Sequence, residues 1–149
     1  MAVDLSVTIG GEAGQGIQTV GELLALACRK AGYHVMAVND FESRIRGGHS
    51  AFRLRVSDRP VRCPVRPIHV LVALNAATVS LHRNDLTSDA VVLFETGDSG
   101  GLDAVAVPFA RLARDAGGRI LANTVAAASC LALLGDPRDL LESVIEERF

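Results

Sequence analysis

The chain opens with apolar and polar residues in alternation, the pattern of a strand. The alternation covers residues 5–9 and continues into two glycines. From Ile17 the apolar spacing changes to three and four residues and holds until Gly32, which predicts a helix that packs one face on a sheet. The sequence GGEAGQG between them predicts a tight glycine-rich turn, so the chain begins as strand, turn and helix.

Short apolar runs then alternate with helix-compatible stretches. Strands are expected at 34–38, 52–56, 69–74, 90–95 and 104–107. Helices are expected at 76–82, at 109–116, at 123–134, which should be buried, and from 136 onward, with Asp136 as N-cap and Pro137 at the first position. Strand, helix and strand in this order predict a parallel crossover. The turn at 57–60 leads to a short run at 61–63, which predicts an antiparallel hairpin with 52–56. The predicted fold is α/β: a three-layer Rossmann-like sheet, mostly parallel, with an antiparallel edge hairpin.

Length and composition place the chain in one class, a single domain over residues 1–149. Of these 149 residues 49% are hydrophobic and 21% charged, enough to bury a core. The formal net charge of -2 argues against nucleic acid or an anionic membrane as partner, and the longest apolar stretch is shorter than the ~20 residues of a membrane span. Three scattered cysteines without a CxxC argue against disulfides, zinc and iron–sulfur clusters, and a reducing cytoplasm is expected. The four histidines lack metal-site spacing, so no metal is expected.

The glycine-rich turn is the first candidate site, because its N–H groups and the helix N-terminus suit an anion such as phosphate. Its residues are Gly11, Glu12, Ala13, Gly14, Gln15 and Gly16. The spacing is neither that of a dinucleotide fingerprint nor that of a P-loop, so it indicates no particular nucleotide. A turn that merely needs positive φ is an equal alternative. Glu12 and Asp40 flank this region as candidate bases, although loop capping explains them better.

The second candidate site is a basic loop. Seven of the 15 basic residues are arginines within residues 44–66. The loop residues predicted to grip an anion are Ser43, Arg44, Arg46, Gly47 and Gly48. The remaining arginines are expected on a solvated strand face or at a subunit interface: Arg53, Arg55, Arg59, Arg62 and Arg66. His49 adjoins the glycines and is either a ligand contact or a structural hydrogen-bonding group. No nucleophile with a suitable base is evident, so no catalytic residue is predicted.

Three segments together resemble the gamma domain of thiamine-dependent 2-oxoacid:ferredoxin oxidoreductases, the pyruvate, ketoisovalerate and 2-oxoglutarate type. They are GGEAGQGIQTVGELLALA, NDFESRIRGGHSAFRLRVSDRPVRCP and LVALNAAT. The pairing of EAGQG and a following QT with SRIRGGH is the specific signal, and it is most similar to a gamma part fused ahead of an alpha part. The SRIRGGH loop argues against the indolepyruvate type. The last helix ends earlier than in the family, which predicts either an excised domain or a short free-standing subunit.

The resemblance implies an enzyme complex that converts a 2-oxoacid, coenzyme A and an oxidised acceptor into acyl-CoA, CO2 and reduced acceptor. It implies that this domain is not catalytic alone and docks coenzyme A through the glycine turn and the basic loop. Thiamine diphosphate, Mg and iron–sulfur clusters would belong to partner domains or subunits, the alpha and beta parts, with ferredoxin as electron acceptor. Two other hypotheses stay open: a stand-alone Rossmann-like nucleotide-binding regulatory module, and a structural domain that only joins subunits. A homo-oligomer of the isolated domain is also open.

Overall fold

The computed structural model describes residues 2–42, 48–95, 101–118, 121–135 and 138–148. Its centre is a six-stranded sheet in the order β2-β3-β1-β4-β5-β6. The strands are β1 (Asp4–Glu12), β2 (His34–Phe41), β3 (His49–Ser57), β4 (Ile68–Ala73), β5 (Leu86–Phe94) and β6 (Ala104–Ala106). The helices are α1 (Ile17–Lys30), α2 (Ala76–His82), α3 (Phe109–Asp115), α4 (Ala122–Leu133) and α5 (Arg138–Arg148), with a 3₁₀ turn η1 (Arg83–Asp85) after α2.

The sheet is mostly parallel, and β3 is its one antiparallel member among the described residues. β1, β4, β5 and β6 pair in parallel, whereas β3 is antiparallel to both β1 and β2. The predicted fold class is therefore confirmed, with an antiparallel hairpin at one edge. β1 and β2 run in the same direction, as the predicted crossover requires, but β3 lies between them.

The hairpin is built from other strands than the sequence suggested. β2 and β3 form it, while residues 61–63 make no strand, so that part of the prediction was wrong. Pro60 and Pro64 flank the segment and lack the N–H groups that a strand partner needs. The Arg55 side chain instead donates to the Cys63 carbonyl at 3.1 Å, which satisfies that backbone group without a second strand.

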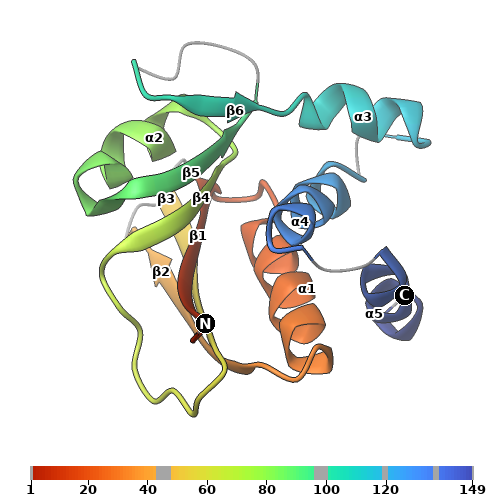
Figure 1. Cartoon of the computed structure of the whole chain (residues 1–149). Coiled ribbons are helices and arrows are strands. Elements are labelled where there is room, and N and C mark those ends of the chain that lie inside the picture. The colour runs from red at the N-terminus through yellow and green to blue at the C-terminus, as the bar shows by residue number, and fades with distance from the viewer. Residues whose placement is uncertain (1, 43–47, 96–100, 119–120, 136–137, 149) are drawn as a thin grey trace.

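Helices cover both faces of the sheet and create three layers, as Figure 1 shows. α1 and α4 pack on one face, where Val7, Ile9 and Leu24 are fully buried, and α5 packs against these two helices. α2 lies on the other face, over a smaller core that includes Leu71 and Val79. Contrary to expectation, α4 is buried on one side only: its Leu133 is 44% exposed.

One contact sets the distance between α1 and the sheet. A Cβ on Gly21 would overlap the Phe52 ring of β3, so the helix approaches closely only because residue 21 is glycine. This close approach fixes the position of the α1 N-terminus relative to the strand ends. In the part of the chain that the structure describes, no helix is long and apolar enough to cross a membrane.

Candidate functional site

The glycine-rich turn begins later than the sequence suggested. Gly10, Gly11 and Glu12 still belong to β1, where they pair with residues 49–51 of β3. Close packing explains the first two glycines, because a Cβ on Gly10 would lie 2.5 Å from Thr78 Cγ2, and one on Gly11 would lie 2.5 Å from Gln15 Oε1. The turn itself therefore runs only from residue 13 to residue 16.

Backbone N–H groups in the turn are divided between internal bonds and free donors. Glu12 N donates to Gln15 Oε1 at 2.6 Å, and Ala13 N donates to the Gly48 carbonyl at 3.1 Å. Gly14 and Gly16 have φ values of 94° and 77°, so the turn does need positive φ. Within the described residues neither of these glycines donates its N–H to a protein acceptor. The first three N–H groups of α1 follow them, since the helical bonds begin with Val20 N to Gly16 O at 3.1 Å.

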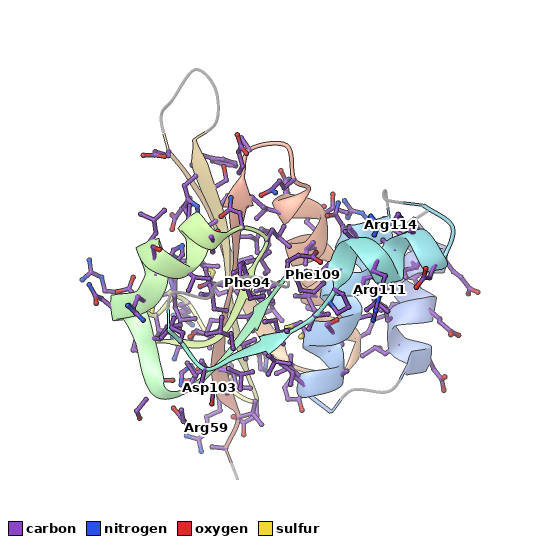
Figure 2. The ribbon with its side chains drawn as sticks, turned by 90° about the horizontal axis from the view of Figure 1, so that it is seen from above. Arg59, Phe94, Asp103, Phe109, Arg111 and Arg114 are labelled. Carbon is purple, nitrogen blue, oxygen red and sulfur yellow. The ribbon has the colours of Figure 1, made fainter. Side chains whose placement is uncertain are left out.

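Topology places this turn where a doubly wound sheet binds ligands. α1 follows β1 on one face and α2 follows β4 on the other, so a crevice opens between the carboxyl ends of these neighbouring strands. Asn75 begins α2 there, and its Oδ1 accepts from Thr78 N at 2.9 Å. The Asn75 amide also lies 3.5 Å from Gln15 Oε1, which connects the turn to the start of α2. Figure 2 shows α2 on one side of the sheet and α3 and α4 on the other.

Two adjoining clefts lie on the α2 side of the turn, and we refer to them together as the paired groove. The first has a volume of about 650 Å³ and is lined by Gly11, Glu12, Glu42, His49, Asn75, Ala77, Ser80 and Leu81. The second has a volume of about 340 Å³ and is lined by Asp40, Phe41, Glu42, His49, Ala51, Arg53, Leu81, His82 and Asp85. Because they share Glu42, His49 and Leu81, they form one continuous depression along the carboxyl edge.

A pair of histidines separates the groove from the core. The Nε2 atoms of His49 and His82 lie 2.9 Å apart, so one donates and the other accepts. Burial lowers the pKa of both imidazoles, and for His82 the neighbouring His49 and Arg53 lower it further against Asp85 and Asp40. Glu42 opposes the shift at His49. The pair is therefore neutral at pH 7. Sequence inspection missed His82, because no local spacing connects residues 33 apart.

A third cleft lies on the opposite side of the turn, with a volume of about 480 Å³. It is lined by Gly14, Gln15, Leu74, Glu95, Phe109, Ala110, Ala122 and Asn123. Glu95 accepts from Ala110 N at 3.1 Å and so binds the first turn of α3. Figure 2 shows Phe109 near the centre of the molecule, with Arg111 and Arg114 further out on the same helix. Asn123 packs against Gly16, where a Cβ would overlap its amide.

The predicted arginines do not form one group. Arg53 Nε lies 2.7 Å from the Asp40 carboxylate, within the second cleft. Arg55 donates twice to Asp4, at 2.9 and 2.8 Å, near the amino end of β1. The arginines after β3 are exposed: Arg59, Arg62 and Arg66. Figure 1 shows their loop, yellow-green between β3 and β4, at the opposite end of the sheet from the start of α1.

Of the basic loop, the structure describes only Gly48, whose carbonyl accepts from the turn. Ser43, Arg44, Arg46 and Gly47 lie outside the described residues, as do the predicted helix-start residues Asp136 and Pro137.

Covalent chemistry has little support at this edge. Cys28 and Cys130 are buried, and burial raises the pKa of the Cys130 thiol to about 12. The exposed Cys63 lies with Arg55 at the amino end. Of the two candidate bases, Asp40 is paired with Arg53, and Glu12 lines the first cleft. Within the described residues, no group of three or more histidine, cysteine or acidic side chains is arranged to hold a metal ion.

Comparison with known protein families accounts for nearly the whole chain. Residues 6–149 match the model of the pyruvate ferredoxin/flavodoxin oxidoreductase family. The chain belongs to this family. The alpha subunit of a 2-oxoacid:ferredoxin oxidoreductase from Aeropyrum pernix is 26% identical over 99% of this chain. The chain spans only 30% of the length of that relative.

Solved structures of the family share the fold. The pyruvate oxidoreductase subunit PORC of Thermotoga maritima superposes with a TM-score of 0.82 at 23% identity, covering 98% of this chain and 85% of that subunit. The 2-oxoglutarate:ferredoxin oxidoreductase of Magnetococcus marinus, solved with 2-oxoglutarate, coenzyme A and succinyl-CoA bound, gives 0.85 at 23% identity over 98% of this chain and 27% of that one. The resemblance seen in the sequence, to 2-oxoacid:ferredoxin oxidoreductases, is therefore confirmed, and the solved structures show the same fold.

Proposed function

We propose that this chain is the gamma domain of a thiamine-dependent 2-oxoacid:ferredoxin oxidoreductase, and that it docks coenzyme A and takes part in subunit assembly. The complex would convert a 2-oxoacid and coenzyme A into acyl-CoA and CO2 and pass the electrons to ferredoxin. Thiamine diphosphate, Mg and iron–sulfur clusters would be held by the alpha and beta parts. This domain would bind the nucleotide end of coenzyme A, so that the thiol extends to a neighbouring domain or subunit of the complex.

One observation carries the proposal: free N–H groups at Gly14, Gly16 and the start of α1 lie at the carboxyl ends of the neighbouring strands β1 and β4, and Gly14 lines the third cleft. N–H groups at a helix start suit phosphate oxygens, because their partial positive charge needs no side chain. The nucleotide of coenzyme A carries several phosphates. A solved member of the family is described with coenzyme A bound, which supports the same ligand for this chain.

The charges of the described residues indicate where the phosphates of coenzyme A would bind. The paired groove holds the carboxylates of Glu12 and Glu42, while its Arg53 is already paired with Asp40. These charges disfavour phosphate within the groove and favour it at the glycine turn. We therefore assign the phosphates to Gly14, Gly16 and the basic loop, where Arg44 and Arg46 would supply positive charge.

The proposal is tested by titrating the purified chain with coenzyme A in a calorimeter, with NAD and inorganic phosphate as comparison ligands. Arg46→Glu places a negative charge in the basic loop, and we expect it to lower the affinity for coenzyme A at least about tenfold. Arg62→Glu makes the same change at the amino end of the sheet and should leave affinity unchanged.

Each outcome separates the hypotheses. Saturable binding of coenzyme A that only Arg46→Glu weakens supports the proposal. Preferential binding of NAD would favour a stand-alone nucleotide-binding module. If no ligand binds, the docking role fails and an assembly role remains; equal affinity in Arg46→Glu would show that the loop assignment is wrong.

A further inference from the structure

The side of the sheet that ends in β2, which we call the β2 edge, is long and open. β2 is the outermost strand on this side and has eight residues, whereas β6 on the opposite side has three. Figure 1 shows β2 beyond β3 at the margin of the sheet. An outermost strand of this length presents a row of N–H and C=O groups with which a further strand can pair.

The hydrogen-bonding pattern identifies which groups point outward. Glu42 N donates to the His49 carbonyl at 2.9 Å, so the even-numbered residues of β2 bond to β3. The odd-numbered residues therefore direct their N–H and C=O groups away from the sheet. These residues are Val35, Ala37, Asn39 and Phe41. In the part of the chain that the structure describes, none of their N–H groups donates to a loop or helix.

The β2 edge lacks the features that keep an outermost strand unpaired. Such strands usually carry proline, lysine or a bulge, which prevent pairing with another chain. β2, with the sequence HVMAVNDF, contains neither proline nor lysine, and its register with β3 is regular. Its one carboxylate, on Asp40, is paired with Arg53 at 2.7 Å. Phe41 at its end is 69% exposed, the most exposed large hydrophobic side chain of the described residues.

We infer that the β2 edge pairs with the β2 edge of a second copy of this chain, antiparallel and about a two-fold axis at Val38. The two sheets then form one continuous sheet, in which both β2 strands are interior. A two-fold contact of this kind uses the same surface on both copies and leaves no β2 edge open. The inference goes beyond the proposed function and does not depend on ligand binding.

The side chains of β2 favour this register. With Val38 at the axis, the two Val38 side chains meet, and the exposed Phe41 lies opposite Val35 of the other copy, so both cross-strand pairs are apolar. Shifting one strand by two residues would place Val35 opposite Asn39, and the reverse shift would place Val38 opposite Asp40. The outward groups of the two strands can form about eight backbone hydrogen bonds in the favoured register.

The helices leave room for this contact. α1 packs on β3 where Gly21 meets the Phe52 ring, one strand inward from the β2 edge. The α1 helices of two copies would therefore be separated by three strand spacings, roughly 14 Å. Packed helices are separated by about 8–10 Å, so the helices do not obstruct the pairing of the strands.

The first test is the mass of the chain in solution, measured by sedimentation equilibrium between about 1 and 500 μM. We expect the mass to increase with concentration from 15.7 kDa to twice this value. The double variant Ala37→Lys with Asn39→Lys changes two exposed positions and places lysines opposite each other in the dimer. Its dissociation constant should be at least about tenfold higher.

A charge-swapped partner separates loss of pairing from loss of folding. Ala37→Glu with Asn39→Glu should also be monomeric by itself, because its glutamates oppose each other. An equimolar mixture of the lysine and glutamate variants should recover the dimer. Val105→Lys, at a half-exposed position of β6 on the opposite side of the sheet, is the control and should leave the dimer unchanged. Circular dichroism checks that each variant is folded.

Single cysteines test the register. In a Cys63→Ser background, which removes the exposed native thiol, Val38→Cys should form an interchain disulfide under oxidised glutathione. Directly opposite residues at this kind of position have Cα atoms about 4.5 Å apart, within the range of a disulfide. Ala37→Cys and Asn39→Cys should form it far more slowly, because each lies opposite a different residue.

Three results would overturn the inference. A monomer mass at every concentration would show that no second copy pairs with β2, and would leave the β2 edge to a segment of another protein. A dimer that is weakened by Val105→Lys and not by the β2 variants would place the contact on β6. Cross-linking at residue 37 or 39 instead of 38 would contradict the register on which the choice of a second copy rests. The proposed function, which is tested by coenzyme A titration, would stand in each case.

Discussion

The two edges of the sheet differ in construction and in charge. At the carboxyl edge, a glycine turn, a neutral histidine pair and the carboxylates of Glu12 and Glu42 surround open clefts. At the amino edge, Arg55 is paired with Asp4, and an exposed loop carries several arginines. Strand β1 has nine residues, so the edges are separated by about 30 Å. Arginines that are close in sequence therefore lie at opposite ends of the sheet. Of these two edges, only the carboxyl edge has the shape of a ligand site.

The largest expected effect concerns two glycines of the turn. Gly16→Ala should reduce the free energy of unfolding by about 3 kcal/mol, because a side chain at positive φ is strained and its Cβ would overlap the Asn123 amide. Gly14→Ala meets open space and should cost only about 1 kcal/mol, from its backbone conformation alone. Urea denaturation of both variants measures the difference. Equal losses would mean that Asn123 does not pack against the turn.

The histidine pair should make stability at the carboxyl edge dependent on pH. An unfolded histidine has a pKa near 6.5, and both folded pKa values are lower. As pH falls below about 6.5 the unfolded chain takes up protons first, so stability falls; above that pH the pair contributes no pH dependence. His82→Gln should flatten this decrease when unfolding is measured between pH 7.5 and 5. His34→Gln, at an exposed position, is the matched control, and an unchanged slope in His82→Gln would contradict the account.

The smallest effect is expected at the amino edge. Asp4→Asn removes the charge that pairs with Arg55, and exposed ion pairs contribute little to stability. Its thermal midpoint should decrease by less than that of Gly14→Ala, with coenzyme A affinity unchanged. Arg55 holds the pKa of Asp4 below its usual value of 3.8, so the pair is lost only as pH falls through the lowered pKa. A loss of coenzyme A affinity in Asp4→Asn would contradict the assignment of ligand binding to the carboxyl edge alone.

Local patterns predicted the elements well, because periodicity reports which side of a strand or helix is buried. The helix from Ile17 and the strand containing Val7 and Ile9 were found in this way. The position of β3 between β1 and β2 was missed. The alternation of apolar and polar residues in β3 indicates that one face of the strand is buried, but it does not indicate which strands pair with it. The strand predicted at 61–63 does not form, and the cause is local, because Pro60 and Pro64 flank the segment.

The candidate site was predicted only in its local part. The motif from Gly11 to Gly16 is contiguous in the sequence; Gly14 and Gly16 have the positive φ that a turn needs, whereas Gly11 belongs to β1. The contact of His49 with His82, and the exposure of Phe41 beside Leu81, depend on how α2 lies over β3. No spacing in the sequence encodes such contacts. The roles of Ser43, Arg44, Arg46 and Gly47 stay predictions.

The most direct test of the central claim is a map of amide chemical shifts in the ¹⁵N-labelled chain as coenzyme A is added. If the carboxyl edge is the docking site, the largest changes will be at Gly14 and Gly16, while Arg62 and Cys63 at the amino edge stay unchanged. Changes centred on the amino-edge loop, or saturation without any change at the glycine turn, would contradict the account.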